Sequence, residues 1–184
     1  MERNIIMAGF GGQGVMLMGK LLSFATCDST DLNVTFFPSY GAEQRGGTAN
    51  CYVVISDEMI GSPMAGLTDD LIVLNQASMD KFEDRIKPGS TIFANTSIVN
   101  RTPDRDDIKV VGAPATEIAI EMGSEKVLNI IMLGMYIGYT KILPEEIVLN
   151  TILKKLGKKA NMIAMNKAAF ERGLDIGKQA AAQA

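Results

Sequence analysis

The residues best suited to chemistry form a glycine-rich segment, G-F-G-G-Q-G, at residues 9–14. The apolar residues 5–8 before it predict a buried strand, and the residues from Val15 onward predict a helix. Glycines at a strand-to-helix turn let the chain bend tightly and leave backbone N–H groups accessible to an anionic ligand or a partner. The segment therefore indicates an α/β protein that takes part in binding a cofactor. This chain could bind the cofactor alone or together with a partner.

A second polar, glycine-rich segment, P-S-Y-G-A-E-Q-R-G-G-T, covers residues 38–48. We expect the strand before it to lie beside the first strand, so both segments should emerge at the edge where ligands bind in open α/β sheets. Arg45 carries a planar guanidinium group that suits a carboxylate or phosphate, and the backbone of Gly46 and Gly47 could approach the same anion. An internal ion pair between Arg45 and Glu43 is the alternative interpretation.

Strands and helices alternate through the first two thirds of the chain. Strand patterns occur at residues 5–8, 33–37, 50–55, 71–74, 91–94 and 109–111, and helical patterns at 14–26, 78–86, 114–123, 126–140, 144–157 and 159–177. Pro88-Gly89 is expected to stop the second helix. This order predicts a three-layer α/β/α fold, with a mostly parallel sheet flanked by helices and a helical C-terminal third. A length of 184 residues fits a single domain over residues 1–184.

Composition argues against several kinds of function. The chain has no histidine and two cysteines, so we expect no metal site and no histidine-based catalysis, and we predict that Cys27 and Cys51 are both buried apolar groups. A formal net charge of −3 indicates no nucleic-acid partner. Residues 127–143 include polar side chains and fall short of the roughly 20 apolar residues that span a membrane. With no secretory signal visible, we expect a cytoplasmic protein.

Gly9, Gly11 and Gly14 match the dinucleotide-binding pattern G-x-G-x-x-G in the required strand–turn–helix context. The rest of that pattern is missing, because the second strand should end in an acidic residue for the ribose hydroxyls and Pro38 follows it instead. A P-loop is excluded, since no Gly-Lys-Ser or Gly-Lys-Thr closes the turn. A self-sufficient NAD- or FAD-binding, Rossmann-like protein remains the alternative.

Several segments resemble the gamma subunit, or gamma domain, of the 2-oxoacid:ferredoxin oxidoreductases. They are G-F-G-G-Q-G-V at residues 9–15, P-S-Y-G-A-E-Q-R-G-G-T at 38–48, N-C-Y-V-V-I-S at 50–56, A-P-A-T-E-I-A at 113–119, N-I-I-M-L-G at 129–134 and N-K-A-A-F-E-R-G at 166–173. The resemblance covers nearly the whole chain. One departure is Ala42, where many members carry proline. Phe10 favours the 2-oxoglutarate type, because pyruvate-type gamma chains often have arginine at that position.

The resemblance implies a division of labour between subunits. Enzymes of this family decarboxylate a 2-oxoacid oxidatively on thiamine diphosphate, pass electrons through iron–sulfur clusters to ferredoxin and release an acyl-CoA. This chain lacks cysteines for clusters and a G-D-G…N-N stretch for a magnesium–diphosphate headgroup. Thiamine diphosphate, Mg and iron–sulfur clusters are therefore expected on partner subunits (alpha, beta and a ferredoxin-like delta), in an enzyme of anaerobic metabolism. The isolated chain is expected to be inactive and to bind no cofactor alone.

The resemblance also implies roles for the site residues, none of them catalytic. Arg45, with the backbone of Gly46 and Gly47, would hold an anion of CoA or of the 2-oxoacid. The predicted interface to the active-site subunits comprises Tyr40, Glu43 and Gln44, together with the close-contact turn of Gly11, Gly12, Gln13 and Gly14.

The sequence leaves three classes of function open, and they differ in what the isolated chain should bind. A non-catalytic subunit of an oxidoreductase complex predicts tight association with larger chains. A self-sufficient dinucleotide-binding protein predicts NAD or FAD binding by the isolated chain. A stand-alone scaffold or regulatory module predicts neither.

Overall fold

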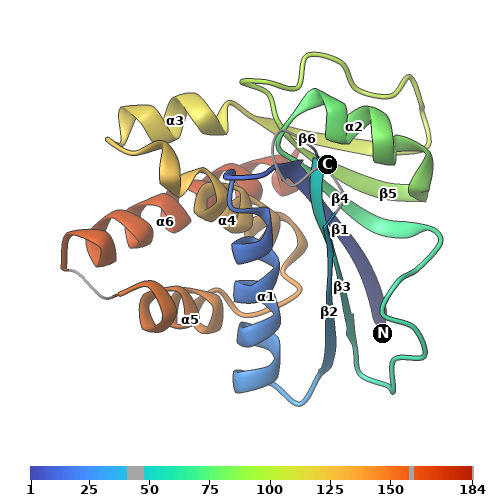
Figure 1. The fold of residues 1–184 in the computed structure, drawn as a ribbon, viewed down its shortest axis with the longest axis horizontal. Coiled ribbons are helices and arrows are strands. Elements are labelled where there is room, and N and C mark those ends of the chain that lie inside the picture. Colours follow the sequence, from blue (N-terminus) through green and yellow to red (C-terminus); the bar gives the residue numbers. More distant parts are fainter. Residues whose placement is uncertain (41–47, 158–159, 184) are drawn as a thin grey trace.

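The computed structural model describes residues 1–40, 48–157 and 160–183, and these fold around one β-sheet (Figure 1). The strands of the described residues follow the order β2-β3-β1-β4-β5-β6. Their bounds are β1 (Glu2–Phe10), β2 (Asn33–Tyr40), β3 (Thr48–Ser56), β4 (Thr68–Val73), β5 (Ile86–Asn95) and β6 (Lys109–Ala113). Strands β1, β4, β5 and β6 run parallel, whereas β3 is antiparallel to both β1 and β2. The predicted mostly parallel sheet is confirmed.

Helices cover both faces of the sheet, as Figure 1 shows. On one face lies α2 (Gln76–Phe82), followed by the short 3-10 turn η1 (Glu83–Arg85). The other face is covered by α1 (Val15–Ser29), α3 (Ala115–Glu121), η2 (Glu125–Val127), α4 (Leu128–Thr140), α5 (Glu145–Leu156) and α6 (Ala160–Ala182). The three-layer α/β/α fold with a helical C-terminal third is therefore confirmed.

The position of β2 corrects one expectation. β2 does not lie beside β1, because β3 lies between them as the return strand of a β2–β3 hairpin. Two successive antiparallel pairings give β2 the same direction as β1. Its last residue, Tyr40, pairs with Ala49 of β3, and the adjacent Thr48 pairs with Phe10 of β1. The ends of the second glycine-rich segment therefore lie at the edge that carries the first.

Two predicted boundaries are wrong. The helix predicted at residues 78–86 ends earlier, because Ile86 already pairs with Thr68 at the start of β5. Pro88 and Gly89 therefore lie within a strand instead of stopping a helix. The last helix continues to Ala182, past its predicted end at residue 177. In the first case strand pairing outweighed the local pattern on which the prediction was based.

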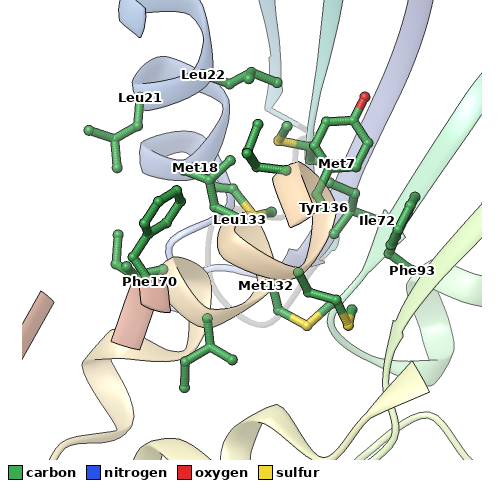
Figure 2. Close-up of a cluster of buried hydrophobic side chains, with 14 of the residues drawn as sticks. Met7, Met18, Leu21, Leu22, Ile72, Phe93, Met132, Leu133, Tyr136 and Phe170 are labelled. Atoms are coloured by element: carbon green, nitrogen blue, oxygen red, sulfur yellow. The ribbon is translucent and has the colours of Figure 1, made fainter. Parts of the chain in front are cut away.

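Helix α4 lies at the centre of the core. Every residue from 128 to 138 is buried, so the helix is enclosed on all sides. Figure 2 shows its side chains among those of α1, the sheet and α6; the labelled residues are Met7, Met18, Leu21, Leu22, Ile72, Phe93, Met132, Leu133, Tyr136 and Phe170. The rings of Tyr136 and Phe93 meet edge to face with centroids 5.1 Å apart. The methionines of this helix are core residues.

Four glycines let α4 and α6 cross with their backbones in contact. Gly134 and Gly138 are about one turn apart on α4, as are Gly173 and Gly177 on α6. A Cβ atom added to any of the four would meet a backbone carbonyl oxygen of the opposite helix. Because a helical backbone cannot move aside as a flexible side chain can, glycine is required at this crossing.

Gly173→Ala should lower the free energy of unfolding by about 3 kcal/mol, since the helices must separate to admit the methyl group. Gly61→Ala is the matched control, because a Cβ there would meet nothing within 4 Å, and it should change stability by less than about 0.5 kcal/mol. Urea unfolding followed by circular dichroism measures both. Equal stability of the two variants would contradict the tight crossing.

At the amino edge of the sheet, a buried carboxylate ties α4 to the strands. Asp70 of β4 is fully buried and accepts hydrogen bonds from the Arg3 guanidinium at 2.5 and 2.8 Å, and from the Tyr136 hydroxyl at 2.9 Å. Burial, and then the charge of Asp70, raise the pKa of Tyr136 well above its usual value of 10.0. The folded protein therefore keeps Tyr136 as the neutral hydrogen-bond donor.

This pKa shift predicts a loss of stability at high pH. Above about pH 10, Tyr136 ionises in the unfolded chain but not in the folded protein, so unfolding releases a proton and the free energy of unfolding falls with pH by up to about 1.4 kcal/mol per unit. Tyr136→Phe should cost about 1–3 kcal/mol at pH 7, because Asp70 loses a buried donor. The difference between wild type and variant should shrink as the pH rises from 9 to 11, measured by urea unfolding. A constant difference over that range would refute the assignment.

Candidate functional site at the carboxyl edge of the sheet

The two glycine-rich segments begin or end at the carboxyl edge of β1 and β2. Phe10 closes β1, Tyr40 closes β2, and Thr48 opens β3 beside Phe10. The predicted site residues Glu43, Gln44, Arg45, Gly46 and Gly47 lie outside the described residues. The structure thus places the ends of their segment at this edge, and their contacts stay predictions.

The first segment forms a tight turn between β1 and α1. Gly12 and Gly14 have φ values of 98° and 79°, in the left-handed region that favours glycine. Gln13 N–H donates to the carbonyl of Phe10 at 3.2 Å and closes the turn. Gly11 and Gly12 are exposed, and the Phe10 side chain beside them is 37% exposed. The turn therefore presents bare backbone next to an apolar ring.

The Gln13 carboxamide points back into the protein. Its Oε1 accepts hydrogen bonds from the Phe10 N–H at 2.6 Å and from Asn75 Nδ2 at 3.1 Å. Its Nε2 donates to the carbonyl of Leu74 at 3.4 Å. Gln13 therefore joins its own turn to the residues that follow β4, and its predicted role at an interface stays a prediction.

Asn75 and Asn95, which the sequence analysis missed, complete this arrangement; we call Gln13, Asn75 and Asn95 the carboxamide network. Asn75 Oδ1 accepts from Ser78 N–H at 2.8 Å and caps α2. Asn95 Nδ2 donates to the Leu74 carbonyl at 3.3 Å, the same oxygen that Gln13 contacts. Asn75 lies two residues after the end of β4, and Asn95 is the last residue of β5; a polar amide at the end of a buried strand was the available signal.

Asn129 of α4 holds the other end of the turn. Its Nδ2 donates to the Gly14 carbonyl at 3.2 Å, and a Cβ on Gly14 would lie 2.5 Å from that nitrogen. The central helix therefore leaves room only for glycine at the start of α1.

One cationic group near this edge, and the two thiols of the chain, have defined environments. Lys81 of α2 donates to Thr48 Oγ1 at 3.0 Å, which places an ammonium group beside the start of β3. Cys51 is buried and contacts the Val15 carbonyl at 3.8 Å; burial raises the pKa of its thiol to about 12, so it is a poor nucleophile. Cys27 is exposed, which corrects the prediction that both thiols are buried.

Two features are absent from the part of the chain that the structure describes. Across residues 1–40, 48–157 and 160–183, no three histidine, cysteine or carboxylate side chains gather in a way that could hold a metal ion. No helix in the same ranges is long and apolar enough to cross a membrane. The described part of the edge offers exposed backbone, an apolar ring and an ammonium group.

Comparison with known proteins identifies the family. Residues 4–176 match the family model described as pyruvate ferredoxin/flavodoxin oxidoreductase. The chain is 38% identical over 176 residues to the ketoisovalerate oxidoreductase subunit VorA of Methanothermobacter marburgensis; the match covers 95% of this chain and 36% of VorA. It is 34% identical to the 2-oxoglutarate synthase subunit KorC of Methanocaldococcus jannaschii, covering 97% of this chain and 96% of KorC.

Solved structures show the same fold. The gamma subunit of a keto/oxoacid ferredoxin oxidoreductase from Geobacter sulfurreducens superposes with a TM-score of 0.88 at 25% identity, covering 98% of each chain. The 2-oxoglutarate:ferredoxin oxidoreductase of Magnetococcus marinus, with 2-oxoglutarate, coenzyme A and succinyl-CoA bound, gives a TM-score of 0.88 at 26% identity, covering 97% of this chain and 31% of that one.

The fold is therefore that of a gamma subunit of oxidoreductases acting on 2-oxoacids. The chain belongs to the pyruvate ferredoxin/flavodoxin oxidoreductase family, which confirms the resemblance found in its motifs. It spans about a third of the length of VorA and of the Magnetococcus chain.

Gly14→Ala should destabilise the protein more than Gly12→Ala. Both glycines have positive φ, so both variants carry about 1–2 kcal/mol of backbone strain. A Cβ at Gly12 meets nothing within 4 Å, whereas at Gly14 it meets the Asn129 carboxamide, which should add about 1–2 kcal/mol. Urea midpoints of the two variants measure the difference, and equal losses would show that Asn129 does not restrict the turn.

Proposed function

We propose that this chain is the gamma-type subunit or domain of a 2-oxoacid:ferredoxin oxidoreductase, and that it packs on catalytic subunits and helps to shape the substrate and CoA site. The observation that supports this most is the exposed Gly11–Gly12 turn beside the ends of the Arg45 segment, at one edge of a gamma-type fold. On this proposal the chain works in the cytoplasm, in anaerobic metabolism, with alpha, beta and ferredoxin-like delta partners.

The cofactors of such an enzyme do not fit the described residues. Thiamine diphosphate with Mg needs carboxylate and amide oxygen ligands, and iron–sulfur clusters need several thiolates. The chain has two cysteines, of which Cys51 is buried with a raised pKa, and its described residues hold no metal-binding group of side chains. We therefore assign these cofactors to partner subunits.

The proposed ligand at the edge is an anion of CoA or of the 2-oxoacid. Arg45, with the backbone of Gly46 and Gly47, would hold a phosphate or carboxylate by paired hydrogen bonds. Lys81, fixed on Thr48 at the start of β3, would add favourable charge nearby. The Magnetococcus relative, whose structure contains coenzyme A and 2-oxoglutarate, supports this ligand class.

For the substrate we propose 2-oxoglutarate, on the basis of Phe10 and of the KorC relative. The VorA relative, with its 38% identity, supports 2-oxoisovalerate as the second candidate. The exposed, apolar Phe10 ring would suit a branched substrate as well. Steady-state activity of the complex with a panel of 2-oxoacids distinguishes 2-oxoglutarate from 2-oxoisovalerate as the preferred substrate.

Dinucleotide binding, the earlier alternative, is disfavoured by the topology. In the NAD-binding arrangement a parallel strand beside β1 ends in the ribose-binding acid. Here one neighbour of β1 is the antiparallel β3, and the parallel neighbour β4 is followed by Leu74 and Asn75. The Asn75 side chain is already bound to Gln13 and Ser78.

We expect the protein, isolated from its own host without oxygen, to arrive in a complex with larger subunits that carry thiamine diphosphate and iron–sulfur clusters. Arg45→Ala should leave assembly intact and raise KM for CoA or the 2-oxoacid at least about tenfold, because a paired charged contact is lost. Native mass spectrometry and steady-state kinetics measure the two effects.

Arg172→Ala is the control, since Arg172 is exposed on α6. It should change neither assembly nor KM. Isolation of the chain alone with a bound nucleotide would refute the proposed function, and unchanged kinetics in Arg45→Ala would refute the role of Arg45.

A further inference from the structure

We propose that Gln13 and Asn75 are positioning residues that hold the exposed Gly11–Gly12 turn ready for its ligand; this inference rests on the proposed function of that turn. The support is the chain of hydrogen bonds from Phe10 N–H through the Gln13 and Asn75 side chains to the first turn of α2. Neither side chain needs to touch the ligand to act in this way.

Backbone donors fix the orientation of both carboxamides. Phe10 N–H can only donate, so the Gln13 atom that it meets is the oxygen. Ser78 N–H likewise requires the Asn75 oxygen, which leaves the Asn75 amino group facing Gln13 Oε1. The orientation of Asn95 is fixed in the same way. Its Oδ1 accepts from the Thr116 N–H at 3.3 Å, so its amino group faces the Leu74 carbonyl. The oxygen and amino ends of all three carboxamides are therefore assigned, and none can be exchanged without breaking a hydrogen bond to a backbone N–H.

Gln13 has little hydrogen-bonding capacity left for a ligand. Its oxygen already accepts two hydrogen bonds, and its amino group donates to the Leu74 carbonyl. The residues that remain open are Gly11 and Gly12, which are exposed and carry no side chain to stabilise their own conformation. Their geometry therefore depends on Gln13, and the orientation of Gln13 depends on Asn75.

Helix α2 extends this dependence to the second segment. Asn75 caps α2 at one end, and Lys81 near the other end donates to Thr48 Oγ1, where β3 begins. The glycine turn and the start of β3 are thus connected through one short helix. A shift of α2 would move both sides of the proposed ligand site together.

The test replaces Asn75 in ways that keep the cap of α2. Asn75→Ser retains an oxygen for the Ser78 N–H but removes the donor to Gln13. Asn75→Asp has the same shape as asparagine and also caps the helix, but it sets an oxygen against Gln13 Oε1. The control is Asn161→Asp, at an exposed position on α6.

Two measurements are made, one of which needs no activity. In the full chain, hydrogen exchange of the Phe10 amide should be at least about fivefold faster in both Asn75 variants, with the Ser78 amide still protected. In the assembled complex, KM for CoA should rise about fivefold in Asn75→Ser, the effect of losing one hydrogen bond, while kcat stays within about twofold of wild type. In Asn75→Asp the rise should be larger, because its carboxylate also repels an anion at the turn. Asn161→Asp should change neither value.

Each other outcome overturns a stated part of the inference. Unchanged exchange at Phe10 would show that Asn75 does not hold the turn. Faster exchange with an unchanged KM would show that the turn needs no positioning for ligand binding. A wild-type complex without 2-oxoacid activity would refute the proposed function and with it the ligand, while exchange at Phe10 would still decide whether Asn75 orders the turn.

Discussion

A helix that is buried on every side can be stable only inside the molecule, and α4 occupies that position here. The sheet and α1 cover part of its surface, and α6 covers more because glycines on both helices let the two backbones touch. The placement of α4 then affects both edges of the sheet. Tyr136 hydrogen-bonds to Asp70 at the amino edge, and Asn129 hydrogen-bonds to the Gly14 carbonyl at the carboxyl edge. One enclosed helix thus connects the amino edge of the sheet to the proposed site at its carboxyl edge.

The two edges are held by different chemistry. At the amino edge the buried carboxylate of Asp70 is paired with Arg3. Burying two charges costs free energy, and their attraction offsets that cost only when the two groups are well aligned. At the carboxyl edge the carboxamide network is neutral, and it satisfies backbone groups without adding charge. A carboxylate at Gln13 or Asn75 would repel an anion at the turn, whereas an amide leaves the local field to Lys81 and, on our proposal, to Arg45. Neutral support is therefore compatible with the anion binding that we propose for this edge.

The six strand positions and the strand–turn–helix start were predictable, because periodicity and glycine placement are local signals. The β2–β3 hairpin was not predictable, because the residues that join the two strands are polar and glycine-rich, as in a ligand-binding loop. Asn75 and Asn95 were missed because their roles depend on which strands become neighbours. The helix crossing was missed for the same reason, because Gly134 and Gly173 are required only where two helices far apart in sequence pack together. The contacts of Arg45 stay a prediction from sequence.

A binding surface made of glycine backbone must be ordered by other residues. Exposed glycines carry no side chains that could order them, and glycine loses more conformational freedom on ordering than any other residue. A ligand that met a loose turn would bear that cost itself, and its affinity would fall accordingly. Here Gln13 Oε1 accepts from the Phe10 N–H and Asn129 Nδ2 donates to the Gly14 carbonyl, so the turn is fixed before any ligand arrives. On our proposal, this chain therefore contributes a pre-ordered backbone surface to a site shared with partner subunits, and Gln13 and Asn129 are the residues that order it.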